Sequence, residues 1–304
     1  MNKKIILCAM IVMIALLLSS CTTIGTKGSA GNSQNYRTGT KGIVFNFINN
    51  NPPSRIYNGD ALTLTVEYVN KGAYDVIGGY FYLTGYDENI IFLDRSATNF
   101  AAKGKSIYNP DGVLVETASF MDSRIVLPEN FNAEELKQNF LLTACYDYET
   151  LATPLVCIDP DPYTTNPVEK TCTVKDVSLS GGQGAPVAVT LVQEESSRNK
   201  VQFKIHVSNV GGGDVIDPTV SVANCHTQLR TTDMDKVSIH AEFSGRPLLC
   251  EPQIIRLSGG SGFAYCSAPT EDFRQMTAYN TILNIYIDYG YRDSISKSVQ
   301  IINR

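Results

Sequence analysis

The sequence lacks several patterns that mark nucleic-acid-binding proteins and common enzymes. Its 304 residues contain no run of five or more basic residues, and the formal net charge is −5, so we expect no nucleic-acid partner. It contains no Gly-x-Ser-x-Gly motif. The glycine clusters at 181–184 and 211–213 are not followed by the Lys-Ser or Lys-Thr of a phosphate-binding loop, so they are more simply turns. We therefore predict no catalytic residues, no cofactor and no enzymatic activity.

Ligands for metal ions are also sparse. The chain has three histidines and no Cys-x-x-Cys pair, and only Cys225 and His226 are adjacent, which argues against a zinc site. Asp159 and Asp161 lie in a proline-rich segment, and calcium prefers carboxylate ligands of this kind. No glycine-containing twelve-residue loop follows them, so a solvated linker is the simpler interpretation. We predict no metal site.

One stretch of the chain occurs twice. Residues 62–76 read LTLTVEYVNKGAYDV and align without a gap with residues 201–215, which read VQFKIHVSNVGGGDV. Apolar residues alternate with polar ones in both copies, which is the pattern of a strand with one buried face. Each run ends in Asn-x-Gly, a turn signal, and then reaches an Asp-Val pair that begins a further strand. The repeat predicts two tandem copies of one β-domain.

The N-terminus has the three parts of an export signal. Lys3 and Lys4 form a positive region, and residues 5–18 are an apolar run that is shorter than the roughly 20 residues that span a bilayer. Residues 18–21 read LSSC, which resembles the cleavage site of a prokaryotic lipoprotein signal peptide. We predict that a lipid on Cys21 anchors an extracytoplasmic protein to a membrane, at the cell surface or in the periplasm. An uncleaved anchor or an ordinary secretory signal is the alternative.

The chain divides into a signal peptide, a tether, two domains and a linker. The predicted signal peptide covers residues 1–20, and residues 21–41 are rich in Gly, Ser, Thr and Asn, as in a flexible tether. Segments 42–158 and 173–304 contain short alternating runs separated by turn signals, which is typical of antiparallel β-sandwiches. Residues 159–172 contain three prolines and predict a stiff linker. We predict an all-β protein with two tandem immunoglobulin-like sandwiches.

Six cysteines remain when the two N-terminal ones are set aside. An even number of cysteines in an exported chain predicts disulfides. A hairpin formed by residues 140–148 and 153–158, with its turn centred on Leu151, would place Cys145 opposite Cys157. The rival pairing joins Cys157 to Cys172, at the two ends of the linker. A disulfide between Cys250 and Cys266 is also plausible, because these residues would lie in neighbouring segments of the second domain. The disulfide candidates are Cys145, Cys157, Cys172, Cys225, Cys250 and Cys266.

Two further expectations concern the ends of the domains. Residues 132–139, which read NAEELKQN, have the only helical composition in the first domain and predict about two helical turns. The final strand of the second domain repeats that of the first. In this alignment Leu283, Ile285, Ile287 and Tyr289 match Leu142, Ala144, Tyr146 and Tyr148.

The strand, Asn-x-Gly turn and following strand resemble a known class of repeat. The segments TVEYVNKGAYDV and KIHVSNVGGGDV are similar to the CARDB-like and related immunoglobulin-like repeats of bacterial and archaeal surface proteins. The resemblance covers about residues 42–302, although the long insertions and the cysteines depart from the simple repeat. It implies an extracytoplasmic sandwich that mediates adhesion or spacing, and it transfers no functional residues.

These features predict a lipid-anchored structural or protein-binding module of the cell envelope. The expected partners are the membrane, through Cys21, and an envelope or surface protein. The alternative function is that of a carbohydrate-binding lipoprotein without catalytic activity, because tyrosines at period 2 could stack on sugar rings. Tyrosines in this pattern more often pack within a sheet, and the sequence identifies no ligand-binding residue. The tyrosines concerned are Tyr80, Tyr82, Tyr86, Tyr289 and Tyr291.

Overall fold

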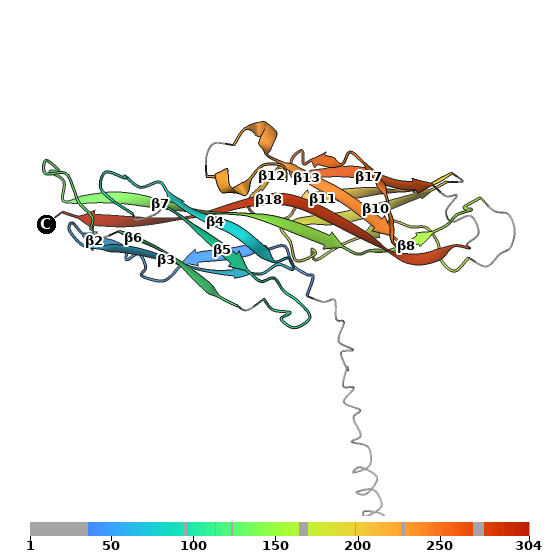
Figure 1. The fold of residues 1–304 in the computed structure, drawn as a ribbon, viewed down its shortest axis with the longest axis horizontal. Coiled ribbons are helices and arrows are strands. Elements are labelled where there is room, and N and C mark those ends of the chain that lie inside the picture. The colour runs from blue at the N-terminus through green and yellow to red at the C-terminus, as the bar shows by residue number, and fades with distance from the viewer. Residues whose placement is uncertain are drawn as a thin grey trace, which may run out of the picture. The chain divides into compact units, whose positions relative to one another are not determined.

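The structure, a computed structural model, describes residues 36–303 apart from positions 94–95, 113, 123, 164–169, 198, 227–228 and 270–276. The predicted signal peptide, the lipidation site Cys21 and most of the tether lie outside the described residues. The described chain belongs to one compact unit that begins at Gln34. Its regular structure consists of strands and two short 3₁₀ turns, which confirms the all-β prediction (Figure 1). No helix in this part of the chain is long and apolar enough to cross a membrane.

The repeated stretch forms an inner strand in each of two small sheets. Strand β3 (Leu62–Asn70) lies in a sheet of order β1-β3-β6, and β11 (Lys200–Asn209) lies in a sheet of order β15-β17-β11-β10-β9. The alternating apolar residues of β3 and β11 are buried, as their period predicts. The other strands of these sheets are β1 (Ile43–Phe47), β6 (Glu116–Asp122), β9 (Val177–Ser178), β10 (Val187–Ser196), β15 (Leu249–Glu251) and β17 (Ser261–Pro269).

A ten-stranded sheet covers both small sheets. Its main path runs β14-β13-β18-β7-β4-β5, while β2, β8 and β12 pair with β18, and β16 pairs with β13. Every pairing is antiparallel except that of β2 with β18. The bounds are β2 (Arg55–Tyr57), β4 (Val76–Thr84), β5 (Ala97–Ala102), β7 (Glu135–Ala152), β8 (Leu155–Ile158), β12 (Asp214–Ile216), β13 (Lys236–Phe243), β14 (Arg246–Pro247), β16 (Ile254–Arg256) and β18 (Tyr279–Ile302).

Aromatic rings connect the small sheets to the large one. Phe45 of β1 lies 5.5 Å from Phe81 of β4, and Tyr68 of β3 lies 5.2 Å from the same ring, measured between ring centroids. In the second half, Phe203 of β11 lies 6.1 Å from Phe243 of β13. Edge-to-face contacts of this kind stabilise a core beyond the area that they bury. Each half of the chain therefore has two packed layers of strands.

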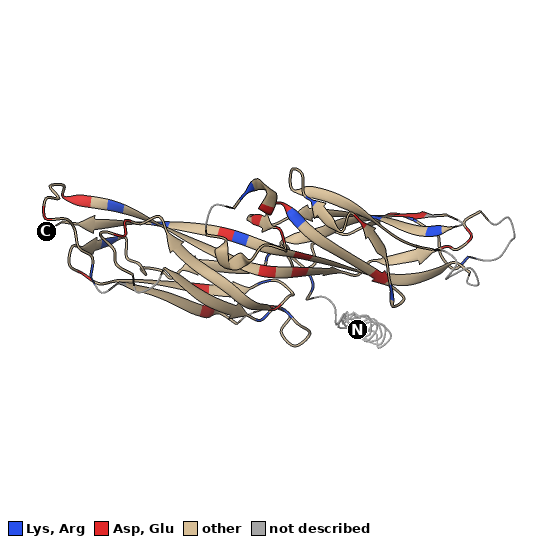
Figure 2. Ribbon diagram, turned by 45° about the horizontal axis from the view of Figure 1, so that its top comes forward, with Lys and Arg blue, Asp and Glu red and all other residues tan. Residues whose placement is uncertain are grey.

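The long strands β7 and β18 join the two halves. All 18 residues of β7 pair with β18, with Tyr146 opposite Tyr291 and Tyr148 opposite Tyr289. Strands from both predicted domains consequently share one sheet, and the domain boundaries at 42–158 and 173–304 remain a prediction. Figure 2 shows that acidic and basic positions occur in both halves.

Two local predictions at the end of the first domain are wrong. Residues 132–139 are not helical, because β7 already begins at Glu135 and pairs there with the end of β18. Long-range pairing has overridden the helical composition. The predicted hairpin with a turn at Leu151 also does not form, because β7 continues to Ala152 and β8 pairs with β18 instead of β7.

Candidate functional site

The first disulfide joins Cys145 to Cys225, so the predicted pairing of Cys145 with Cys157 is wrong. The two Cα atoms are 6.4 Å apart. The prediction failed because it depended on the hairpin that does not form. Cys225 comes from the insertion between β12 and β13, which lies over the outer face of β4 and β7.

This insertion makes several contacts with the first half of the chain. Tyr82 of β4 donates a hydrogen bond from its hydroxyl to the carbonyl oxygen of Ala223, and its ring stacks on His226 with centroids 4.1 Å apart. A buried cluster surrounds the disulfide and consists of Tyr82, Cys145, Ile216, Val222 and Cys225. The disulfide and this cluster hold the two halves together on the outer face of the large sheet.

The other two disulfides agree with pairings that the sequence allowed. Cys157 pairs with Cys172, with Cα atoms 5.8 Å apart, which is the rival pairing that clips the linker. Cys250 pairs with Cys266 across β15 and β17, as predicted. Three disulfides are typical of an oxidising, extracytoplasmic location.

The linker carboxylates and the histidines are engaged in protein contacts. Asp159 accepts a hydrogen bond from Lys170 Nζ at 2.6 Å, which favours the interpretation as a linker. His206 lies on the outer face of its sheet, with its Nε2 3.0 Å from Gln193 Oε1, and the rings of His240 and Tyr286 are in tilted contact with centroids 4.9 Å apart. No group of three or more metal-ligating side chains occurs among the described residues.

The tyrosines proposed for sugar stacking are mostly inaccessible. Tyr289 and Tyr291 are 1% and 2% exposed, and Tyr82 is 7% exposed. Tyr80 and Tyr86 are half-buried, and Tyr80 stacks on Tyr82. Their period-2 spacing reflects packing on a sheet, so a sugar would need another surface.

A pair of acidic residues faces outward from the paired long strands. Glu149 of β7 lies directly opposite Asp288 of β18. Partial burial raises the pKa of Glu149, the negative charge of Asp288 raises it further, and Arg37 and His240 oppose this rise. Partial burial also raises the pKa of Asp288. An acidic pair of this kind is by itself no binding site.

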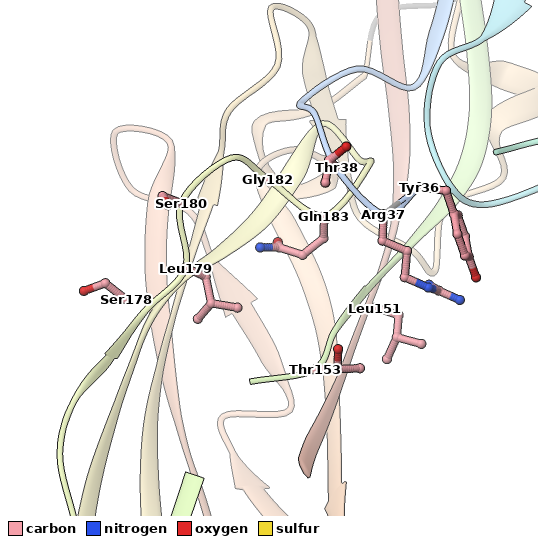
Figure 3. A pocket seen from close by; sticks show the side chains of 10 residues that line it. All are labelled: Tyr36, Arg37, Thr38, Leu151, Thr153, Ser178, Leu179, Ser180, Gly182 and Gln183. Carbon is pink, nitrogen blue, oxygen red and sulfur yellow. The ribbon is translucent and has the colours of Figure 1, made fainter. Parts of the chain in front are cut away.

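The strongest candidate for a binding site is a pair of cavities beside β9. The first cavity, of about 530 Å³, is lined by Ser178, Leu179 and Gln183 on one side and by Leu151 and Thr153 at the end of β7 on the other (Figure 3). Tyr36, Arg37 and Thr38 add a polar wall from the start of the described chain.

The second cavity also lies beside β9. Its volume is about 720 Å³, and Ser178 lines it as well. Leu155 and Cys157 of β8 form one wall, and Cys172 and Lys175 lie on the other. We call the two cavities together the β9 groove. The disulfide between Cys157 and Cys172 bridges its walls.

The backbone of Ser178 is directed to the open side of its sheet. The N–H of Leu179 donates to the carbonyl oxygen of Thr190 at 3.0 Å, so Leu179 faces β10. Because successive backbone groups of a strand point in opposite directions, the N–H and C=O of Ser178 point away from β10. No described strand pairs with β9 on that side. The site therefore combines an open strand edge with walls of mixed polar and apolar side chains.

Sequence reasoning missed this groove. The position of Ser178 at the edge of a sheet depends on the pairing of β9 with β10, and no local pattern in the sequence predicts that pairing. The sequence feature that pointed to the groove was the rival disulfide between Cys157 and Cys172, because this bond places β8 beside the segment before β9. No known family model matches the chain, and no curated protein matches its sequence.

Proposed function

We propose that the chain is a non-catalytic, lipid-anchored module of the cell envelope that binds another envelope protein. In this proposal Cys21 carries the lipid, and the folded part consists of two immunoglobulin-like halves of the CARDB-like kind. The tandem repeat of β3 and β11, each an inner strand facing the large sheet, supports this relationship.

The observation that carries the proposal is the backbone of Ser178 in the β9 groove, which points away from β10 to a side where no described strand pairs with β9. An extended segment of a partner protein can add to such an edge as a further strand, with its backbone hydrogen bonds supplying affinity. Alternate side chains of that segment would enter the two cavities, beside Leu179 and Leu155. Specificity would then follow from the shapes and polar groups of the cavities.

Exposed strand edges are usually protected because they promote unwanted association. Here β9 is short, and the disulfide between Cys157 and Cys172 fixes the groove wall beside it. A short, rigid edge limits aggregation and still offers a site for one partner strand. The Cys145–Cys225 disulfide and the β7–β18 pairing support the additional role of a stiff spacer.

Site-specific photocrosslinking in intact cells tests the proposal. The variant Ser178→p-benzoylphenylalanine should give one dominant crosslinked envelope protein, identified by mass spectrometry after purification through a C-terminal tag. The matched control is Glu195→p-benzoylphenylalanine, on the exposed side of the neighbouring strand β10, which should give none. Equal products at the two positions, or none at Ser178, would contradict a groove partner.

The same spectra test the anchor. An N-terminal peptide whose first residue is diacylated or triacylated Cys21 is the expected result. An unmodified peptide that continues from residues before Cys21 would contradict the proposed lipoprotein signal, while leaving the groove proposal to the crosslinking result.

One observation favours carbohydrate binding as a second candidate. Phe263 and Tyr265 of β17 are 45% and 36% exposed, and Lys204 Nζ lies 4.5 Å from the centroid of the Phe263 ring. Exposed rings of this kind can stack on sugars, whereas the buried Tyr289 and Tyr291 cannot. Binding to cell-wall polysaccharide that is lost on Phe263→Ala, together with no protein crosslink at Ser178, would favour this function.

A further inference from the structure

The loop between β5 and β6 has an apolar tip. Ile107 and Tyr108 form its turn and are 53% and 91% exposed. Two backbone hydrogen bonds between Ser106 and Asn109, of 3.0 and 3.1 Å, close the turn. The Ser106 hydroxyl also accepts hydrogen bonds from the backbone of Tyr108 and Asn109. The tip is therefore a defined structure, although Gly, Asn and Asp are the residues usual in tight turns.

The loop packs against the beginning of the described chain. The backbone N–H of Lys105 donates to the carbonyl oxygen of Gly72 at 2.7 Å, and Lys105 Nζ donates to the carbonyl oxygen of Thr38 at 3.2 Å. The backbone N–H of Lys71 donates to the carbonyl oxygen of Gly42 at 2.9 Å. These contacts fix the base of the loop beside the point at which the N-terminal segment joins the folded unit.

Several lysines lie close to this base, although the whole chain is acidic. Lys103 pairs with Asp75 at 2.6 Å and remains 76% exposed. Asp75 precedes β4, and the acidic residue within the loop itself is Asp111. We define the basic cluster as Lys41, Lys71, Lys103 and Lys105.

The length of the preceding chain brings this region close to the predicted anchor. About 15 residues separate Cys21 from Tyr36, and a flexible coil of that length has a typical end-to-end distance of roughly 20 Å. The basic cluster and the apolar tip belong to the part of the folded unit that the tether enters.

We propose that the loop tip is a second membrane contact, in which Ile107 and Tyr108 enter the headgroup region of an anionic lipid surface. Tyrosine favours this region because its ring is apolar and its hydroxyl is polar. The basic cluster would lie against the lipid phosphates, since basic side chains are attracted to anionic leaflets. The inference rests on the proposed lipid anchor. Two exposed side chains alone would hold the protein on a membrane only weakly, and stable membrane binding takes two signals. The loop would orient the folded unit, so that the β9 groove has a fixed direction relative to the membrane.

Vesicle flotation tests this contact separately from the anchor. The probe is the mature chain with Cys21→Ser, which has no lipid, and vesicles of phosphatidylcholine and phosphatidylglycerol in a two-to-one ratio. We expect measurable binding at low salt and loss of most binding at high salt, because exposed charges are screened. Vesicles of phosphatidylcholine alone should bind at least several-fold less protein.

Two matched sets of variants assign the binding to the loop. Ile107→Ser with Tyr108→Ser should reduce vesicle binding about tenfold. The control pair, Leu249→Ser with Phe92→Ser, removes an aliphatic and an aromatic side chain that are 61% and 55% exposed, from β15 and from the loop between β4 and β5. It should leave binding unchanged. Lys41→Gln should weaken binding by about fivefold, while Lys200→Gln on β11, also exposed, should not.

The outcomes separate this inference from the proposed function. Equal losses for the loop pair and the control pair, or no binding to anionic vesicles, would overturn the membrane contact. Acylated Cys21 and a Ser178 crosslink would still support the proposed function in that case. Tyrosine fluorescence cannot replace vesicle flotation as the measurement, because the chain contains 16 tyrosines and the signal of Tyr108 would not be resolved. Circular dichroism that matches the parent protein excludes misfolding of the loop pair as the cause of a loss.

Discussion

Tyr148 donates a hydrogen bond to Asn70 Oδ1 at 3.1 Å, and Tyr291 makes the same bond to Asn209 Oδ1 at 3.4 Å. Each asparagine also accepts a hydrogen bond from the glycine two residues later. The Asn-x-Gly turns of the two copies are therefore the same structure, and Tyr148 is equivalent to Tyr291. The sequence alignment that matched Tyr148 with Tyr289 is displaced by two residues.

This equivalence makes the pairing of β7 with β18 symmetric. Tyr146 and Tyr289 are also equivalent, because their hydroxyls accept from the backbone N–H of Ile43 and Val187, the first residues of the matching strands β1 and β10. In the sheet Tyr146 lies opposite Tyr291, and Tyr148 lies opposite Tyr289. The two copies thus associate as the subunits of a twofold dimer do, but within one chain.

The close approach of Tyr291 to Gly211 predicts that alanine substitutions at Gly211 and at the adjacent Gly212 differ in their effect on stability. A Cβ at Gly211 would overlap Tyr291 Oη and lie 2.8 Å from Pro186 Cβ, whereas a Cβ at Gly212 meets nothing within 4 Å. Gly211→Ala should lower the free energy of unfolding by about 1–3 kcal/mol. Gly212→Ala should change it by less than about 0.5 kcal/mol. Urea unfolding under oxidising conditions measures both, and similar values would contradict this geometry.

The tyrosine hydroxyl itself should contribute to stability. Tyr148→Phe keeps the ring and removes the group that donates to Asn70 and accepts from the N–H of Tyr74. We expect a loss of about 1–3 kcal/mol in the free energy of unfolding, because buried polar groups lose their partner. Tyr108→Phe, which changes an exposed hydroxyl in the same half, is the control and should have no measurable effect.

The disulfide map gives a direct test of the fold. Peptide mapping without reduction should recover Cys145 linked to Cys225, and no peptide that links Cys145 to Cys157. Replacing both Cys145 and Cys225 by alanine should lower stability by about 2–4 kcal/mol, since the bond closes a long loop between the halves. The control is the double alanine variant of Cys250 and Cys266, which closes a loop of 16 residues and should cost less in the loop-entropy model. A recovered Cys145–Cys157 peptide would contradict the β7–β18 pairing.

The acidic pair Glu149 and Asp288 should make the free energy of unfolding depend on pH. The folded state raises the pKa values of Glu149 and Asp288, so protonation favours folding. This contribution is present below the ordinary carboxyl pKa of about 4 and is lost as the pH rises through the raised values. Glu149→Gln should therefore raise stability at pH 7 by a few tenths to about 1 kcal/mol, and the gain should vanish near pH 3. A gain that persists at low pH would contradict the electrostatic cause.

The sequence by itself determined the class of the fold and the position of its central strands. Alternation at period 2 is a local property, so β3 and β11 were predicted with their buried faces. The Asn-x-Gly turns were recognised for the same reason. The disulfides Cys157–Cys172 and Cys250–Cys266 could be proposed from the sequence because the two cysteines of each pair lie close together in the chain.

Only the tertiary structure decided which strands pair. The extension of β7 to Ala152, the loss of the expected helix and the Cys145–Cys225 bond all follow from the pairing of β7 with β18. The β9 groove likewise exists because β9 pairs with β10 on one side and with no described strand on the other. Such pairings join residues far apart in the sequence, and no local pattern encodes the partner of a strand.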